Sequence, residues 1–229
     1  MDTQDTDLIR NLSLFHGMSQ KHFGALMKAA RLENFARGTV LIREGQMPAF
    51  LHIVIKGTVE LFANHDGKES TLDLIEPVAT FILAAVIRDE MYLKSARSFT
   101  PTQILMIPAA AVRNVFSRDA AFARSIVNEL ASRYRGIVRS LKNERMRSSA
   151  ERLAAWIRDE ERRQGHRGYV ELKYGKRLLA STLGMTPENL SRTLSLLSAH
   201  GAGCEGRQIT ITDRQALAAF ARPNPLIDS

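Results

Sequence analysis

Glu188, Ser191 and Arg192 are polar side chains whose types and spacing suit contact with the edges of nucleic-acid bases. On a helix, positions three and four apart lie on one face, so these side chains would point the same way. A glutamate can accept a hydrogen bond from cytosine N4, and an arginine can donate two to guanine O6 and N7. The alternative is an ion pair between Glu188 and Arg192. Both can hold, because such a pair would orient the arginine.

Residues 176–199, KRLLASTLGMTPENLSRTLSLLSA, are predicted to form two short helices joined by a tight turn. Gly184 stands where the turn needs a residue without a Cβ. Thr186 and Pro187 are types preferred at an N-cap and at the first helical position. The buried face of the second helix would carry Leu190, Leu194 and Leu197. An ordinary helical hairpin is the alternative, but these spacings favour a helix-turn-helix, whose second helix enters the DNA major groove.

The predicted base-reading side chains lie at the start and on the outer face of the second helix. They are Thr186, Pro187, Glu188, Asn189, Ser191, Arg192 and Ser195. Residues 201–212 are predicted to form a β-hairpin, which makes the unit a winged helix-turn-helix. Lys176, at the start of the first helix, and Arg207, at the hairpin tip, are predicted to contact phosphate, which positions a protein on DNA without specifying sequence.

The composition supports a globular protein with a polyanionic partner. The chain has 229 residues, 45% of them hydrophobic, and a net charge of +8, so it can hold two domains and bind nucleic acid. The single cysteine, Cys204, leaves no disulfide framework and no cysteine cluster for zinc or iron–sulfur. No apolar run approaches the ~18 residues of a membrane span. The first residues are acidic and polar, unlike a secretory signal, so we expect a cytoplasmic location and no membrane partner.

Residues 33–107 show the pattern of short β-strands, after predicted helices in residues 8–32. Apolar or alternating runs separated by turn residues occur at 40–42, 51–55, 59–62, 72–75 and 104–107. Their spacing of near ten residues predicts a small antiparallel barrel or roll, with a hairpin tip at residues 64–68. Residues 80–87 interrupt the strands with an apolar, helix-like pattern.

A helix of about 27 residues is predicted to begin at Asp119 and to mediate dimerisation. Its main apolar stripe is Ile126, Leu130, Tyr134, Ile137 and Leu141. An adjoining stripe is Ala123, Val127, Ala131 and Val138. The alternative is a helix buried inside one chain, but helices that read DNA usually come in symmetric pairs.

These elements predict an α+β fold with three parts. They are a β-roll sensor domain with flanking helices (1–118), a dimerisation helix (119–146) and a winged helix-turn-helix (147–229). A polar break, KNERMR at residues 142–147, is a candidate hinge. Ser148 and Glu151 after it form a predicted capping box.

A glycine-punctuated roll, a long dimer helix and a winged helix together resemble the Crp/Fnr family of bacterial transcription regulators, over nearly the whole chain. The family's recognition helix begins Glu-x-x-Ser-Arg, which stands here as Glu188-Asn189-Leu190-Ser191-Arg192. The serine at this position resembles the pattern of the family's fumarate-nitrate branch. This resemblance implies DNA half-sites of the form TTGAT. The resemblance also implies three partners: double-stranded DNA, a second copy of the chain, and RNA polymerase.

The resemblance offers three classes of effector. Iron–sulfur sensing needs four cysteines and is excluded by the one present. Cyclic-nucleotide binding needs a Gly-Glu pair followed by Arg-Ser-Ala. Residues 80–85 carry neither glycine nor glutamate, and Lys94-Ser95-Ala96 is a partial match whose lysine lacks the bidentate fork that suits phosphate. Cyclic AMP is therefore not expected to bind.

The third class is a ligand in an apolar pocket. Phe81, Ile82, Leu83, Tyr92 and Leu93 are the expected lining, with a purely structural core as the alternative. The segment FILAAVIRDEMYLKSAR resembles the nitric-oxide-responsive denitrification regulators of the family, which implies sensing through haem. His16 is the named candidate for an axial ligand, beside His52 and His200, although none lies in a haem motif.

Other function classes receive less support from the residues. The sequence shows no paired carboxylates in a cleft pattern, no metal-spaced His/Cys cluster, no Gly-x-Ser-x-Gly and no phosphate loop, so no catalysis is expected. Two alternatives stay open: a regulator controlled by a cyclic nucleotide or another small ligand, and a DNA-binding protein without an effector. The roll of some 75 residues would be surplus for the second.

Overall fold

The computed structural model describes residues 3–228 and divides the chain into two compact units, Met1–Arg133 and Tyr134–Ser229. The division falls inside helix α5 (Ala120–Met146), whose 27 residues match the predicted length. The division into three parts stays a prediction, because the two units share the helix that was expected to form the middle part.

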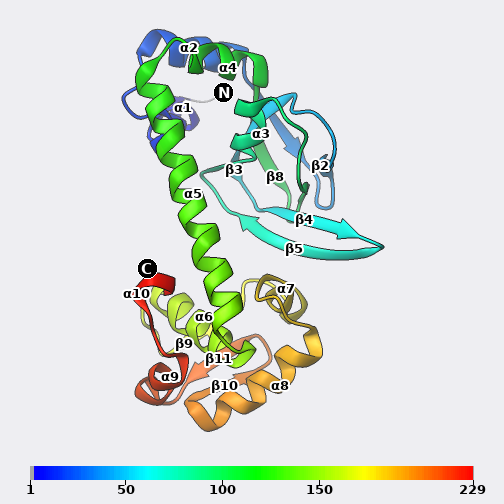
Figure 1. The fold of residues 1–229 in the computed structure, drawn as a ribbon, viewed down its shortest axis with the longest axis vertical. Helices are drawn as coiled ribbons and strands as arrows, with labels where there is room; N and C mark the ends of the chain where they lie inside the picture. The colour runs from blue at the N-terminus through cyan, green and yellow to red at the C-terminus, as the bar shows by residue number, and fades with distance from the viewer. Residues whose placement is uncertain (1–2, 229) are drawn as a thin grey trace. The chain divides into compact units, whose positions relative to one another are not determined.

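The first unit contains the predicted antiparallel β-roll, built from two four-stranded sheets (Figure 1). One sheet has the order β1 (Arg31–Phe35), β8 (Thr102–Pro108), β3 (Phe50–Lys56) and β6 (Ala79–Phe81). The other has the order β2 (Val40–Ile42), β7 (Ser95–Ser98), β4 (Val59–His65) and β5 (Lys68–Ile75). The β4–β5 turn has Asp66 and Gly67 at φ of 50° and 76°, the pattern of a type I′ hairpin, and confirms the predicted tip.

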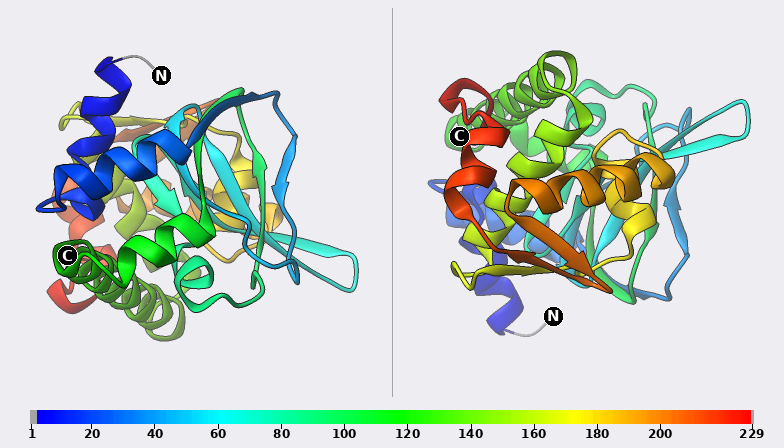
Figure 2. Two further views of the ribbon diagram at one scale, coloured as in Figure 1. Left: turned by 90° about the horizontal axis from the view of Figure 1, so that it is seen from above. Right: turned by 90° about the horizontal axis from the view of Figure 1, so that it is seen from below.

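Two apolar cores hold this unit together, one on each face of the first sheet. Strand β3 contributes to both, because Leu51, Ile53 and Ile55 point to one face and Val54 to the other. The first core packs the sheet against α1 (Thr3–Arg10), α2 (Gln20–Ala29), α3 (Leu83–Arg88) and α4 (Ala109–Phe116). Figure 2 (left) shows α2 and α4 beside the strands, with the β4–β5 hairpin extending away. The second core fills the space between the sheets.

The sequence does not predict three of the strands. Strands β1 and β7 lack a clear apolar pattern, and β6 lies at the start of the segment that is predicted to be helix-like. Strand β7 is Ser-Ala-Arg-Ser, and its Arg97 donates to Glu60 on β4 at 2.7 Å and to Glu69 on β5 at 2.6 Å. The predicted helix-like segment 80–87 is partly wrong. Its first residues pair with β3 as β6, and Ile82 then adopts a left-handed conformation (φ 63°) before α3 begins.

The second unit is the winged helix. Helix α6 (Ser149–Arg163) begins with the predicted capping box of Ser148 and Glu151. It is followed by β9 (Tyr169–Glu171), α7 (Lys176–Thr182), α8 (Pro187–Leu197), β10 (Ala202–Glu205), β11 (Gln208–Ile211), α9 (Arg214–Ala221) and α10 (Pro225–Asp228). The strands form one sheet in the order β10-β11-β9. Within residues 3–228 no helix combines the length and apolarity needed to cross a bilayer.

Asp119 fixes the start of α5. Its buried carboxylate accepts hydrogen bonds from Phe122 N (3.0 Å), Ser19 N (3.1 Å) and His22 Nδ1 (2.8 Å). Ser19 is itself the N-cap of α2, so one carboxylate joins the beginnings of two helices. These hydrogen bonds, above all that from Phe122 N, lower the pKa of Asp119 well below its ordinary value.

Asp119→Ala should lower the free energy of unfolding of the first unit by about 2 kcal/mol at pH 7, because it removes a helix cap and leaves buried donors unpaired. A carboxylate with a depressed pKa stabilises above its ordinary pKa, and this contribution disappears as the pH falls below that value. The parent should therefore lose more stability than the variant between pH 6 and pH 3, measured by urea unfolding with circular dichroism. Glu90→Ala, which removes an exposed ion pair with Arg88, is the control and should change little. Equal acid sensitivity of parent and Asp119→Ala would contradict the assignment.

Candidate nucleic-acid interface

The turn between α7 and α8 is built as the sequence predicts. Gly184 has φ 63°, and its N–H donates to Ser181 O at 3.0 Å. Thr186 is the N-cap of α8, with its hydroxyl accepting from Asn189 N at 3.2 Å, and Pro187 follows at the first helical position. Leu190, Leu194 and Leu197 are buried in the core of the second unit. This geometry confirms a helix-turn-helix in which α8 keeps one polar face exposed. Figures 1 and 2 (right) show α7 and α8 joined by the short turn.

The predicted base-reading side chains share that outer face. Exposed among them are Thr186, Pro187, Glu188, Ser191, Arg192 and Ser195, while Asn189 is half-buried. The two serine hydroxyls donate back to the helix, Ser191 to Pro187 O (3.0 Å) and Ser195 to Ser191 O (3.2 Å). Their oxygens therefore face solvent as acceptors, able to receive a hydrogen bond from a base amino group.

Glu188 is held in its ionised form at the start of α8. Its pKa is lowered by hydrogen bonds from its own backbone N–H and from the Thr186 hydroxyl, and by the charge of Arg192. An ionised carboxylate can only accept hydrogen bonds, which suits the amino group of cytosine. The attraction between Glu188 and Arg192 means that the two readings of this pair, ion pairing and base contact, are compatible.

The two predicted phosphate contacts differ in their surroundings. Lys176 is the first residue of α7, after Gly175 as N-cap, and is half-buried. Arg207 lies in the β10–β11 turn, but its guanidinium donates to the carbonyls of Leu172 (2.8 and 3.2 Å) and Lys173 (2.7 Å). Arg207 thus ties the wing to the chain after β9 while staying exposed, and its contact with phosphate remains a prediction.

The expected effector pocket is not assembled as the sequence suggested. Phe81 and Tyr92 are buried in the core between the sheets, and Leu83 is buried in the core on the other face. Ile82 is half-buried, while Leu93 is 87% exposed. The prediction of one common pocket is corrected, because these side chains fill two cores or face solvent.

The three histidines offered as haem ligands occupy unlike places. His16 is exposed, and its carbonyl accepts from Ser125 Oγ at 3.1 Å. His200 is half-buried, with its ring 4.3 Å from that of Phe220. His52 is buried on β3, 5.1 Å from the Phe81 ring, and burial lowers its pKa to about 4. Within residues 3–228, no hydrogen-bond partner is found for His52 Nδ1, and no group of three or more His, Cys, Asp or Glu could hold a metal.

The predicted dimer stripe of α5 is only partly exposed. Ile126 is fully buried in the first unit, and Leu130 packs against the same core, so these two are corrected to core residues. Tyr134, Ile137 and Leu141 are exposed. The exposed apolar positions with heptad spacing combine the two predicted stripes: Val127, Ala131, Tyr134, Val138 and Leu141. We call these five residues the α5 seam. Their steps of four and three are the coiled-coil signal that separates them from the core stripe.

Comparisons with known proteins agree with this architecture. Residues 32–119 match the cyclic nucleotide-binding domain, and residues 151–220 match the Crp-like helix-turn-helix domain. No curated protein matches the chain.

Solved structures with the same fold include three regulators. A regulatory protein from Silicibacter pomeroyi DSS-3, for which cAMP binding has been proposed, is 27% identical, with a TM-score of 0.60 over 96% of this chain and 99% of that one. FixK2 from Bradyrhizobium japonicum is 22% identical, with a TM-score of 0.70 over 83% and 96%. DNR from Pseudomonas aeruginosa is 24% identical, with a TM-score of 0.53 over 96% and 99%. The last two similarities show the fold alone.

Arg207→Ala should lower the free energy of unfolding of the second unit by about 2 kcal/mol. The reason is that the variant loses the three hydrogen bonds that the charged guanidinium donates to two backbone carbonyls. Trp156, which packs at the edge of this unit's core, gives a fluorescence signal for denaturant unfolding. Arg177→Ala, an exposed position on α7, is the control and should change stability by less than about 0.5 kcal/mol. If Arg207→Ala keeps the parent's unfolding midpoint and binds all DNA sequences more weakly, Arg207 acts as a phosphate contact and not as a tie in the wing.

Proposed function

This chain belongs to the Crp/Fnr family of transcription regulators, which are not enzymes, and we propose that it binds a TTGAT-type palindrome as a homodimer. The observation that carries the proposal is the outer face of α8, where an ionised glutamate, two acceptor hydroxyls and an exposed arginine follow a capped N-terminus. A helix-turn-helix places such residues in the major groove. RNA polymerase is the further partner that we propose for the DNA-bound form.

Arg192 is proposed to read the guanine of each half-site, and Glu188 the nearby cytosine. Arg192→Ala should cost roughly 1–3 kcal/mol per half-site and flatten the preference at the guanine. Lys176→Ala should instead weaken all sequences alike and reduce the salt slope of binding by about one. Selection of sites from a random DNA pool at two salt concentrations distinguishes the two effects. If Arg192→Ala selects the same guanine as stringently as the parent, direct readout by Arg192 is wrong.

The α5 seam is proposed as the dimer interface. Two observations support it: Tyr134 and Leu141 are at least half exposed although apolar, and the five seam positions repeat with steps of four and three. Monomeric proteins rarely expose an apolar stripe of this kind without a partner. A symmetric pair of α8 helices also explains why a palindrome would be the target.

Val138→Glu should convert the dimer to a monomer, because two unpaired charges would be buried facing each other in the seam. Light scattering after size exclusion measures the mass directly. Ser140→Glu places the same charge at an exposed α5 position outside the seam and should remain dimeric. A dimeric Val138→Glu protein would contradict the seam.

For the signal, we propose nitric oxide or a related nitrogen oxide, on the strength of the sequence of residues 81–97 and its resemblance to nitric-oxide-responsive regulators. Haem does not fit His16, because this side chain is exposed and the apolar residues expected around a haem fill two cores or face solvent. No step through haem is therefore derived. Cyclic AMP is the alternative, favoured by the Silicibacter relative. One observation argues against cyclic AMP binding. Arg97, the arginine nearest in sequence to Lys94 and Ser95, is already paired with Glu60 and Glu69 and is not free to bind a phosphate.

We expect calorimetric titration with cyclic AMP to give no binding heat, and nitric oxide under anaerobic conditions to change operator affinity. The reason for the first is that the roll offers a half-buried lysine where phosphate would need a free arginine fork. Cyclic GMP is the control for the titration with cyclic AMP, and the same anaerobic buffer without any nitrogen oxide is the control for nitric oxide. Binding of cyclic AMP at micromolar concentrations would contradict the proposed nitric-oxide signal and would favour control by a cyclic nucleotide.

A further inference from the structure

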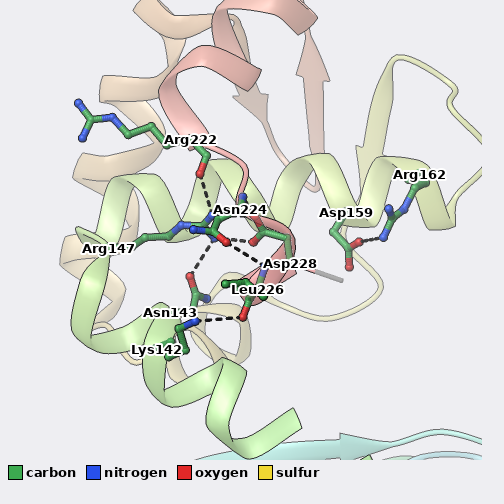
Figure 3. Close-up of polar contacts among 9 residues, drawn as sticks. All are labelled: Lys142, Asn143, Arg147, Asp159, Arg162, Arg222, Asn224, Leu226 and Asp228. Atoms are coloured by element: carbon green, nitrogen blue, oxygen red, sulfur yellow. Dashed lines mark hydrogen bonds and ion pairs between the residues drawn. The ribbon is translucent and has the colours of Figure 1, made fainter. Parts of the chain in front are cut away.

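The turn between α5 and α6 contains a buried guanidinium. The Arg147 side chain is 5% exposed and donates to Asn143 Oδ1 (3.2 Å), Arg222 O (2.9 Å) and both carboxylate oxygens of Asp228 (2.5 and 2.7 Å) (Figure 3). This set fills the fork of the guanidinium with acceptors from α5, from the end of α9 and from α10. Charged hydrogen bonds of this bidentate kind are among the strongest in proteins.

Helix α10 has few other attachments to the unit. Leu226 is 70% exposed, and its carbonyl accepts from Lys142 Nζ at 3.4 Å. Asp228 also accepts from Asn224 N at 2.7 Å, which closes α10 on itself. The pKa of Asp228 is lowered, first by its hydrogen bond with Arg147, so the carboxylate is ionised. The ion pair between Asp228 and Arg147 is therefore a buried, charged link of α10 to the turn.

A second arginine connects the same turn to the helix-turn-helix. Arg152 on α6 donates to Arg147 O (2.9 Å) and Glu144 O (3.4 Å), which are carbonyls at the end of α5. It also donates to Leu183 O (3.2 Å), directly before Gly184 in the turn that leads to α8. Arg147 is thus held by α10 through its side chain, and its carbonyl is held by Arg152, which also bonds the turn before the recognition helix.

We propose that Arg147 is a positioning residue for DNA recognition: it fixes the direction of α8 relative to the C-terminal half of α5, and α10 acts as a latch that holds it through Asp228. The proposal rests on the proposed function, because only a DNA-reading dimer needs this direction fixed. Two half-sites are bound together only if both recognition helices keep a set separation and orientation. Without Asp228, a buried guanidinium would lack its counter-charge and would leave its place, which releases the turn.

Asp228→Asn is the test variant and Asp159→Asn the matched control. Asp159 also pairs with arginines, Arg162 and Arg163, but within α6 alone. Figure 3 shows the pair with Arg162. Hydrogen exchange of the full chain without DNA should speed up at the amides of residues 143–152 by at least about tenfold in Asp228→Asn. The amides of Leu190 and Leu194 should keep the parent rate, which a general loss of stability would not allow. The control should match the parent throughout.

Operator affinity should fall by at least about tenfold in Asp228→Asn and recover in Asp228→Glu, which restores the charge. Unchanged exchange at residues 143–152, or equal acceleration at Leu190 and Leu194, would overturn the latch. Faster exchange with parental operator affinity would overturn the positioning role. If neither the parent nor any variant binds a TTGAT-type operator, the proposed function fails, while the exchange result still decides whether α10 latches the turn.

Discussion

Helix α5 carries two different apolar faces, and much of the remaining architecture depends on how they are placed along it. One face points into the core of the roll and consists of residues spaced by four: Phe122, Ile126 and Leu130. The seam residues follow steps of four and three instead, which keep one line of side chains on the same side of a supercoiled helix. The two stripes therefore diverge along the helix. One continuous helix can then complete a core with its first turns and offer an apolar line to a partner with the rest.

The helix-turn-helix could be predicted from sequence because its determinants are local. All of them lie within 24 residues: the turn glycine, the threonine that caps α8 and the three leucines. Each acts through backbone geometry or through the helical period. The β-roll was predicted as a class but not strand by strand. Strand β7 depends on Glu60, which is 37 positions away from Arg97, and no local pattern announces such a partner. The assignment of Ile126 to the dimer failed because periodicity identifies an apolar face without saying which surface covers it.

Arginine is used here as an internal connector as much as a surface charge. Each of several guanidiniums donates to acceptors on an element or loop other than its own. They are Arg97 in the roll, Arg133 from α5 to Thr80 on β6, Arg147 and Arg152 at the turn after α5, and Arg207 in the wing. The planar fork with five donors makes arginine suited to this role, whereas lysine is a point charge. The net charge of +8 is therefore an imperfect guide to the surface that binds DNA, because several of these arginines hold the fold together.

The length of the α5 seam affects the protein concentration at which the proposed dimer forms and occupies DNA. From Val127 to Leu141 it rises only about 21 Å along the helix axis, which is short for a coiled coil. If the proposed dimer forms through the seam, an interface of this length makes dimerisation dependent on protein concentration under dilute conditions. Occupancy of a palindrome would then vary with nearly the square of the concentration of free chains. A modest change in synthesis would produce a steep change in the number of occupied operators.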